Sequence, residues 1–63
     1  MQRSQIMKFF TYQHLPDHLK VISKPIADLA EKMVKELPEN EESYMALRKL
    51  LEAKDCAVRA AGV

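Results

Sequence analysis

The sequence of 63 residues contains a single cysteine, a single glycine and no tryptophan. The one thiol, Cys56, cannot form an internal disulfide, and no set of Cys and His residues has the spacing of a zinc site. No secretory signal with a basic start and an apolar run is recognisable, so the free cysteine predicts a reducing, cytoplasmic location. A chain this short, without disulfide or metal, is expected to gain support from partner subunits.

Long apolar runs and an excess of charge of one sign are missing as well. The longest apolar runs span only a few residues, which predicts no membrane-spanning helix. Ten basic and nine acidic residues leave a formal net charge of +1. This balance argues against binding to DNA or to an anionic membrane surface, so any anion would have to be captured locally.

The sequence also lacks the residue patterns of catalysis. No Ser is placed beside a His and an acid, and no glycine-rich loop could cradle a phosphate. His14 and His18 are four residues apart, but Pro16 lies between them and no third metal ligand is close in sequence. We therefore expect no enzyme, no catalytic residue, no cofactor and no metal site.

The residues that are present favour an all-α fold. Apolar residues recur at spacings of three and four, which predicts one face of an amphipathic helix over about residues 16–37. Pro16 suits the first turn of this helix, whereas Pro25 predicts a kink, or a short leading helix, near Ser23 and Lys24. The residues of the expected apolar face are Leu19, Ile22, Ile26, Leu29, Ala30, Met33 and Leu37.

A second helix is predicted over about residues 41–61, with Asn40 as its N-cap and Gly62 closing it. Its apolar stripe comprises Leu47, Leu50, Leu51, Ala57, Val58 and Ala61. Because the connection is only a few residues long, the two helices are expected to form an antiparallel hairpin. Residues 1–63 then form a single domain, in which residues 1–15 are an N-terminal arm, either a short helix or an extended segment, and Met1 to Ser4 are loose. Lys54 falls within the stripe, where we expect its ammonium group to reach water or an anion.

Three of the four aromatic residues, Phe9, Phe10 and Tyr12, lie within four positions of the arm. This cluster suggests binding. Phe9 and Phe10 are expected to anchor the arm on the hairpin or on another subunit. Tyr12 is the better candidate for stacking on a nucleobase, because it is followed by the polar residues Gln13 and His14.

Two basic residues lie away from the faces that the hairpin would bury. Lys24 points roughly opposite the apolar face of the first helix, and Arg59 lies off the stripe of the second. Together with Tyr12 they could bind a flat, anionic ligand, the cations pairing with phosphate. Each residue also has a simpler interpretation: Tyr12 as packing, Lys24 as a solvated lysine, and Arg59 as a partner of Asp55.

The order of several short motifs resembles the helical-hairpin domain of phage anti-CBASS proteins, which also appears in phage anti-Thoeris proteins. The resemblance covers about residues 9–61. It is carried by Phe10-Thr11-Tyr12-Gln13-His14-Leu15-Pro16, Ser23-Lys24-Pro25, Asp28-Leu29-Ala30, Leu37-Pro38-Glu39-Asn40 and Ala46-Leu47-Arg48-Lys49-Leu50-Leu51-Glu52-Ala53.

The resemblance implies a small all-helical homo-oligomer, typically a hexamer. Such proteins sequester cyclic di- and trinucleotides such as cyclic GMP-AMP in the cytoplasm of the infected bacterial host and do not degrade them. Immune evasion follows because CBASS effectors are not activated. Residue by residue, Tyr12 corresponds to a base-stacking tyrosine, Lys24, beside Ser23, to a basic residue on phosphate, and Arg59 to a basic residue near the end of the second helix. We include His14 in the expected site.

Two other classes of function explain part of the sequence. A helical protein-protein interaction module without a nucleotide ligand accounts equally well for the amphipathic helices and the aromatic cluster. A nucleic-acid binder would require a basic stripe, and the interspersed acidic residues argue against one.

Overall fold

The computed structural model describes residues 3–62, and within this range every regular element is helical. The elements are α1 (Arg3–Met7), the 3₁₀ helix η1 (Lys8–Phe10), α2 (Asp17–Glu36) and α3 (Glu41–Ala61). None of the helices in this range is long and apolar enough to cross a membrane.

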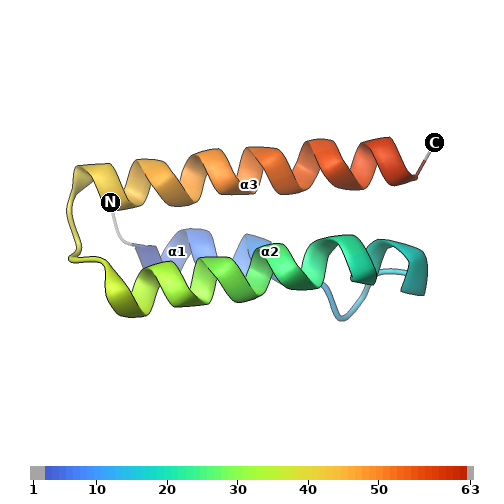
Figure 1. The fold of residues 1–63 in the computed structure, drawn as a ribbon, viewed down its shortest axis with the longest axis horizontal. Helices are drawn as coiled ribbons and strands as arrows, with labels where there is room; N and C mark the ends of the chain where they lie inside the picture. The colour runs from blue at the N-terminus through green and yellow to red at the C-terminus, as the bar shows by residue number, and fades with distance from the viewer. Residues whose placement is uncertain (1–2, 63) are drawn as a thin grey trace.

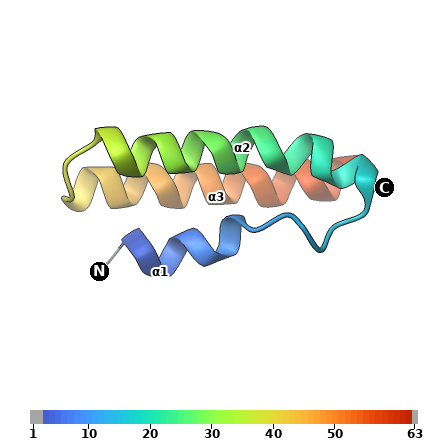
Figure 2. The ribbon, with the colours of Figure 1, turned by 90° about the horizontal axis from the view of Figure 1, so that it is seen from below.

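The two long helices form an antiparallel hairpin, and the N-terminal arm packs along it (Figure 1). Figure 2 shows α1 and η1 on one side of the layer formed by α2 and α3, with contacts to both long helices. The arm starts near the α2–α3 turn and runs to mid-hairpin, and a loop over residues 11–16 then leads to the start of α2. Of the two forms that the sequence left open for the arm, its described part adopts the helical one up to Phe10.

The ends of α3 coincide with the range expected from the sequence because local hydrogen bonds cap both of them. Asn40 Oδ1 accepts a hydrogen bond from the Ser43 N–H at 2.8 Å, and Ser43 Oγ accepts one from the Asn40 N–H at 3.1 Å. This reciprocal pair is a capping box in which Ser43 takes the role more often played by Glu or Gln. At the other end, the Gly62 N–H donates to the Val58 carbonyl at 2.9 Å.

Removal of the N-cap should weaken α3 measurably. We expect Asn40→Ala to lower the free energy of unfolding by about 1 kcal/mol, because the Ser43 N–H loses its acceptor. Asn40→Asp keeps an acceptor at the helix N-terminus and serves as the control. Urea unfolding followed by circular dichroism measures both, and equal stabilities of the two variants would contradict this role of Asn40.

Helix α2 continues through Pro25, so the expectation of a separate leading helix is wrong. Pro25 lacks the N–H that would have bonded to the carbonyl of Val21, but the hydrogen bonds on either side keep one helix over 20 residues. Packing of α2 against α3 along its length outweighs this local defect.

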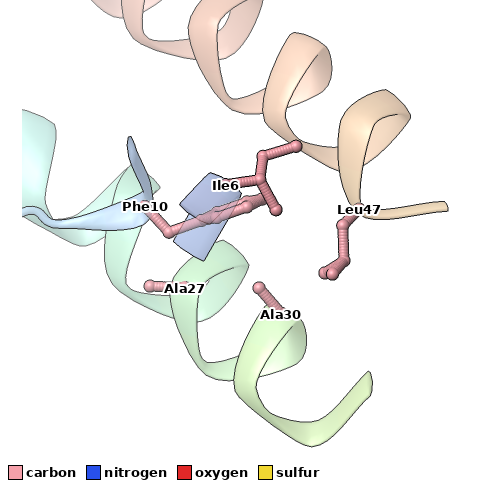
Figure 3. Packing of buried hydrophobic residues seen from close by; sticks show 5 residues of the cluster. All are labelled: Ile6, Phe10, Ala27, Ala30 and Leu47. Atoms are coloured by element: carbon pink, nitrogen blue, oxygen red, sulfur yellow. The ribbon is translucent and has the colours of Figure 1, made fainter. Parts of the chain in front are cut away.

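The core lies where the arm meets the hairpin (Figure 3). Phe10 is 2% exposed and Leu47 is fully buried, and they pack with Ile6 from the arm and the small residues Ala27 and Ala30 of α2. Small side chains on α2 leave room for the phenyl ring and the isoleucine to insert between the helices. The arm is therefore part of the core.

The apolar face expected for α2 is confirmed in part. Ala30 is buried, and Ile26 and Met33 pack against the core, as their spacing predicts. Leu29 is 46% exposed and Leu37 is also exposed, although both fit the same spacing. Ser23 and Ala27, which the predicted stripe did not include, are buried beside Ala30.

A hydrogen bond also ties the start of the arm to the turn of the hairpin. Arg3 is buried, and its Nη1 donates to the Leu37 carbonyl at 2.9 Å. That carbonyl belongs to the C-cap of α2 and has no partner within the helix, so a guanidinium group is a suitable donor. The prediction that Met1 to Ser4 are loose is wrong for Arg3 and Ser4, which belong to α1, whereas Met1 and Gln2 lie outside the described residues.

Candidate ligand-binding site

Tyr12 lies in the loop between η1 and α2 and is half-buried against the core cluster. Its backbone groups are used within the loop: its N–H donates to Gln13 Oε1 at 3.2 Å, and its carbonyl accepts from the Leu15 N–H at 3.0 Å. The packing interpretation of Tyr12 is therefore confirmed, and its role in stacking stays a prediction.

Lys24 lies on the exposed side of α2, where it forms an ion pair with Asp28. Its Nζ is 2.8 Å from Asp28 Oδ2. The pKa of Lys24 is raised, first by this hydrogen bond and by the charge of Asp28, then by Tyr12 and, more weakly, by Glu31, while desolvation acts in the opposite direction. The ammonium group is therefore charged at neutral pH, and Tyr12 is close enough to influence it.

Ser23, the neighbour of Lys24, points into the protein instead of toward the solvent. Its side chain is fully buried, and Ser23 Oγ has no hydrogen-bond partner among the described residues. A ligand at the surface of this chain cannot reach it, which corrects the expectation that Ser23 contacts the ligand. The helix period explains the difference, because adjacent residues point about 100° apart.

His14 and Arg59 are exposed, but they lie apart from each other in the sequence and on different elements. His14 occupies a turn of the loop, two residues after Tyr12. Arg59 lies in the last turn of α3, where its Nη2 is 3.5 Å from Cys56 Sγ, and the ion pair expected with Asp55 is not formed within residues 3–62. No hydrogen bond or ion pair in this range joins Arg59 to Tyr12 or Lys24.

The hollow beside Tyr12 is small. It has a volume of about 100 Å³ and is bounded by the arm, the loop and α2, with Glu31 on its rim. Sites that enclose ligands the size of a dinucleotide usually have volumes of roughly 300–1,000 Å³. The hollow of one chain is therefore too small to enclose a dinucleotide.

Lys54 has a different environment from the one that its sequence position suggested. The side chain is only 8% exposed, and Nζ donates to the carbonyls of Phe9 at 2.7 Å and Thr11 at 3.4 Å. The expectation that the ammonium group reaches water or an anion is wrong. It instead binds carbonyls at the C-terminal end of η1, where backbone acceptors lack helical partners.

The largest concave surfaces lie elsewhere, on both sides of Tyr44 and Arg48 of α3. One, of about 640 Å³, extends from these residues to the α2–α3 turn, and the other, of about 450 Å³, extends to Lys8 and Phe9 of the arm. Sequence analysis did not select Tyr44 and Arg48, although their spacing of four on a helix places an aromatic ring beside a cation. Among residues 3–62, neither these surfaces nor the hollow beside Tyr12 is lined by a buried polar atom that lacks a partner. The choice of Tyr12 and Lys24 therefore rests on the resemblance described above.

The remaining titratable residues show no further site. Two additional ion pairs, Lys20 with Asp17 and Lys49 with Glu52, have separations of 3.8 Å and lie on the surface, where such pairs contribute little. Within residues 3–62, no three His, Cys, Asp or Glu residues gather in a way that could hold a metal ion.

Comparison with known proteins found no matching family model, no similar curated protein and no similar solved structure.

Proposed function

We propose that this chain binds and sequesters cyclic di- and trinucleotides of the cyclic GMP-AMP type without degrading them. In an infected bacterial cell this would keep CBASS effectors inactive, as the resemblance to phage anti-CBASS and anti-Thoeris proteins implies. Two side chains support the proposal: Tyr12, half-buried on the loop before α2, and Lys24, an exposed cation on α2 whose pKa is raised first by Asp28 and then by Tyr12. Base stacking and phosphate neutralisation require this pair of groups.

We infer that a second copy of the chain completes the site. The hollow beside Tyr12 is too small for a dinucleotide, and the surface near Lys24 also carries the acidic groups of Asp28 and Glu31. Two ligand phosphates need more positive charge than one paired lysine supplies. Arg59, exposed and without an acidic partner among the described residues, is the cation that we expect a neighbouring subunit to contribute.

Isothermal titration calorimetry with cyclic GMP-AMP tests the proposed function, combined with light scattering to determine the mass of the assembly. We expect binding by a homo-oligomer, such as the hexamer that the resemblance implies. We also expect to recover the ligand unchanged after the protein is denatured. The absence of binding heat at micromolar concentrations of protein and ligand would refute the function. Binding by a monomer would instead refute the shared site.

Two substitutions on α2 should change affinity in opposite directions. Lys24→Gln removes the ammonium group, and we expect weaker binding with a smaller dependence on salt. Asp28→Asn removes the carboxylate that competes with phosphate for Lys24, and we expect tighter binding. Lys49→Gln, which changes an exposed lysine of α3, is the control for net charge. Calorimetry at two salt concentrations measures all three, and weaker binding by Asp28→Asn would contradict the role of Lys24.

A helical protein-protein interaction module is the second candidate, because several large apolar side chains lie on the surface. Phe9, Val21, Leu29 and Met45 are all exposed, and Phe9 and Met45 border the concave surfaces at Tyr44 and Arg48. This function predicts a co-purifying protein and a melting temperature that cyclic nucleotides do not change. A rise in melting temperature with cyclic GMP-AMP would favour the nucleotide-binding function instead.

A further inference from the structure

We propose that Lys54 is the positioning residue that holds Tyr12 in place for ligand binding, an inference that rests on the proposed function. Lys54 belongs to α3 and lies more than forty residues from Tyr12 in sequence. Its ammonium group nevertheless donates to the carbonyls of Phe9 at 2.7 Å and, more weakly, of Thr11 at 3.4 Å, both in the segment that leads into Tyr12. Thr11 is covalently joined to Tyr12, so fixing its carbonyl restricts the backbone from which the tyrosine ring projects.

Lys54 is buried, so its ammonium group depends on protein atoms for its hydrogen bonds. A buried ammonium group is costly unless polar groups replace the water that it has lost. Here two backbone carbonyls do so, one at a distance of 2.7 Å that is typical of charge-assisted hydrogen bonds. The side chain touches no carboxylate within ion-pair distance among residues 3–62, so backbone recognition is its whole polar environment there.

Among residues 3–62, no other hydrogen bond or ion pair links residues 8–15 to the hairpin. The remaining hydrogen bonds of residues 8–15 within the described chain are local: Thr11 Oγ1 donates to the Lys8 carbonyl, and both backbone groups of Tyr12 bond within the loop. Apolar packing of Phe10 holds the arm against the core, but packing alone does not define the direction in which the chain leaves η1. The extended backbone of Thr11, with φ of −62° and ψ of 145°, begins at the point that Lys54 fixes.

The contact matters for binding because it would hold Tyr12 in the binding position before the ligand arrives. If the loop samples several positions, affinity falls in proportion to the fraction of molecules with Tyr12 in the binding position. Loss of a charge-assisted hydrogen bond is sufficient to change that fraction, and we expect affinity for cyclic GMP-AMP to fall roughly ten-fold in Lys54→Met. Methionine preserves the length and apolar stem of the side chain but cannot donate to the two carbonyls.

The decisive measurement follows Tyr12 without ligand. The chain has two tyrosines and no tryptophan, so Tyr44→Phe leaves Tyr12 as the only strong intrinsic fluorophore. In this background we expect Lys54→Met to increase acrylamide quenching of Tyr12 and to lower its fluorescence anisotropy, with the helical circular dichroism of α2 and α3 retained. Lys49→Met removes a surface lysine from the same helix and should leave the quenching unchanged.

The outcomes separate the positioning role from the proposed function. Unchanged quenching in Lys54→Met would overturn the positioning role, whether or not the protein binds a nucleotide. Loss of helicity in Lys54→Met and also in Lys54→Gln, which retains a donor, would overturn it as well, since Lys54 would then support the hairpin as a whole. Increased quenching in a protein that does not bind cyclic GMP-AMP would support the positioning and refute the nucleotide-binding function.

Discussion

Replacement of Phe10 by alanine is expected to destabilise the protein far more than replacement of its neighbour Phe9. Phe10 is 2% exposed and fills the space between the arm and the hairpin, whereas Phe9 is 55% exposed. Truncation of a buried phenylalanine costs about 3–5 kcal/mol, from lost burial and from the cavity that remains. A domain of this length has a total stability of only roughly 3–9 kcal/mol, so Phe10→Ala should leave much of the chain unfolded.

Phe9→Ala is the matched control, because it removes the same ring one residue away. We expect a change within about 0.5 kcal/mol, since Phe9 loses only surface contacts, among them the Lys8 ammonium group 5.3 Å from its ring centroid. Thermal and urea unfolding followed by circular dichroism measure both variants. Equal destabilisation by the two substitutions would show that the arm does not pack as described.

Replacement of Tyr12 by alanine is expected to cause the largest loss of ligand affinity. Stacking of one base on an aromatic ring contributes about 1–3 kcal/mol, so the dissociation constant for cyclic GMP-AMP should rise roughly ten- to hundred-fold. Tyr12→Phe retains the ring and should bind nearly as well as the unmodified chain. Because Tyr12 also packs against the core, the stability of Tyr12→Ala must be measured beside its affinity.

Tyr44→Phe and Arg48→Ala distinguish this site from the other concave surfaces of the chain. If the ligand binds at Tyr12, Arg48→Ala should leave the affinity unchanged. A loss of affinity in Arg48→Ala together with normal binding by Tyr12→Ala would move the site to α3. Calorimetry with the same ligand compares all of these variants directly.

The sequence predicted helix ends correctly where the capping residues lie next to the helix in the chain. Asn40 and Gly62 predicted the bounds of α3, because caps are formed by residues within one turn of the helix end. The separate leading helix considered at Pro25 is not formed, since α2 runs through that residue and packs on α3. The spacing of Leu29 fits an apolar face, but its side chain is exposed because burial depends on which surfaces meet in the fold.

Part of the candidate site was also predictable from the sequence, because the exposure of a side chain depends partly on its local position. The exposure of Lys24 and of His14 follows from local position, and Tyr12 was identified from its place in an aromatic and polar segment. The burial of Ser23 was a matter of tertiary contacts, although the helix period already places it about 100° from Lys24. The partner of Arg59 and the shape of the complete pocket depend on subunit contacts, which remain part of the proposal.

The sequence by itself determined that this protein is helical, where its hairpin turns, and which residues could present a ring and a cation to a ligand. Those properties depend on hydrogen bonds and spacings within a few residues. Only the tertiary structure decided that the arm is part of the core, that Phe10 rather than Phe9 anchors it, and that Lys54 binds the carbonyls beside Tyr12. Contacts between residues far apart in the sequence leave no periodic trace in it, because burial and hydrogen bonding depend on which surfaces meet when the chain folds.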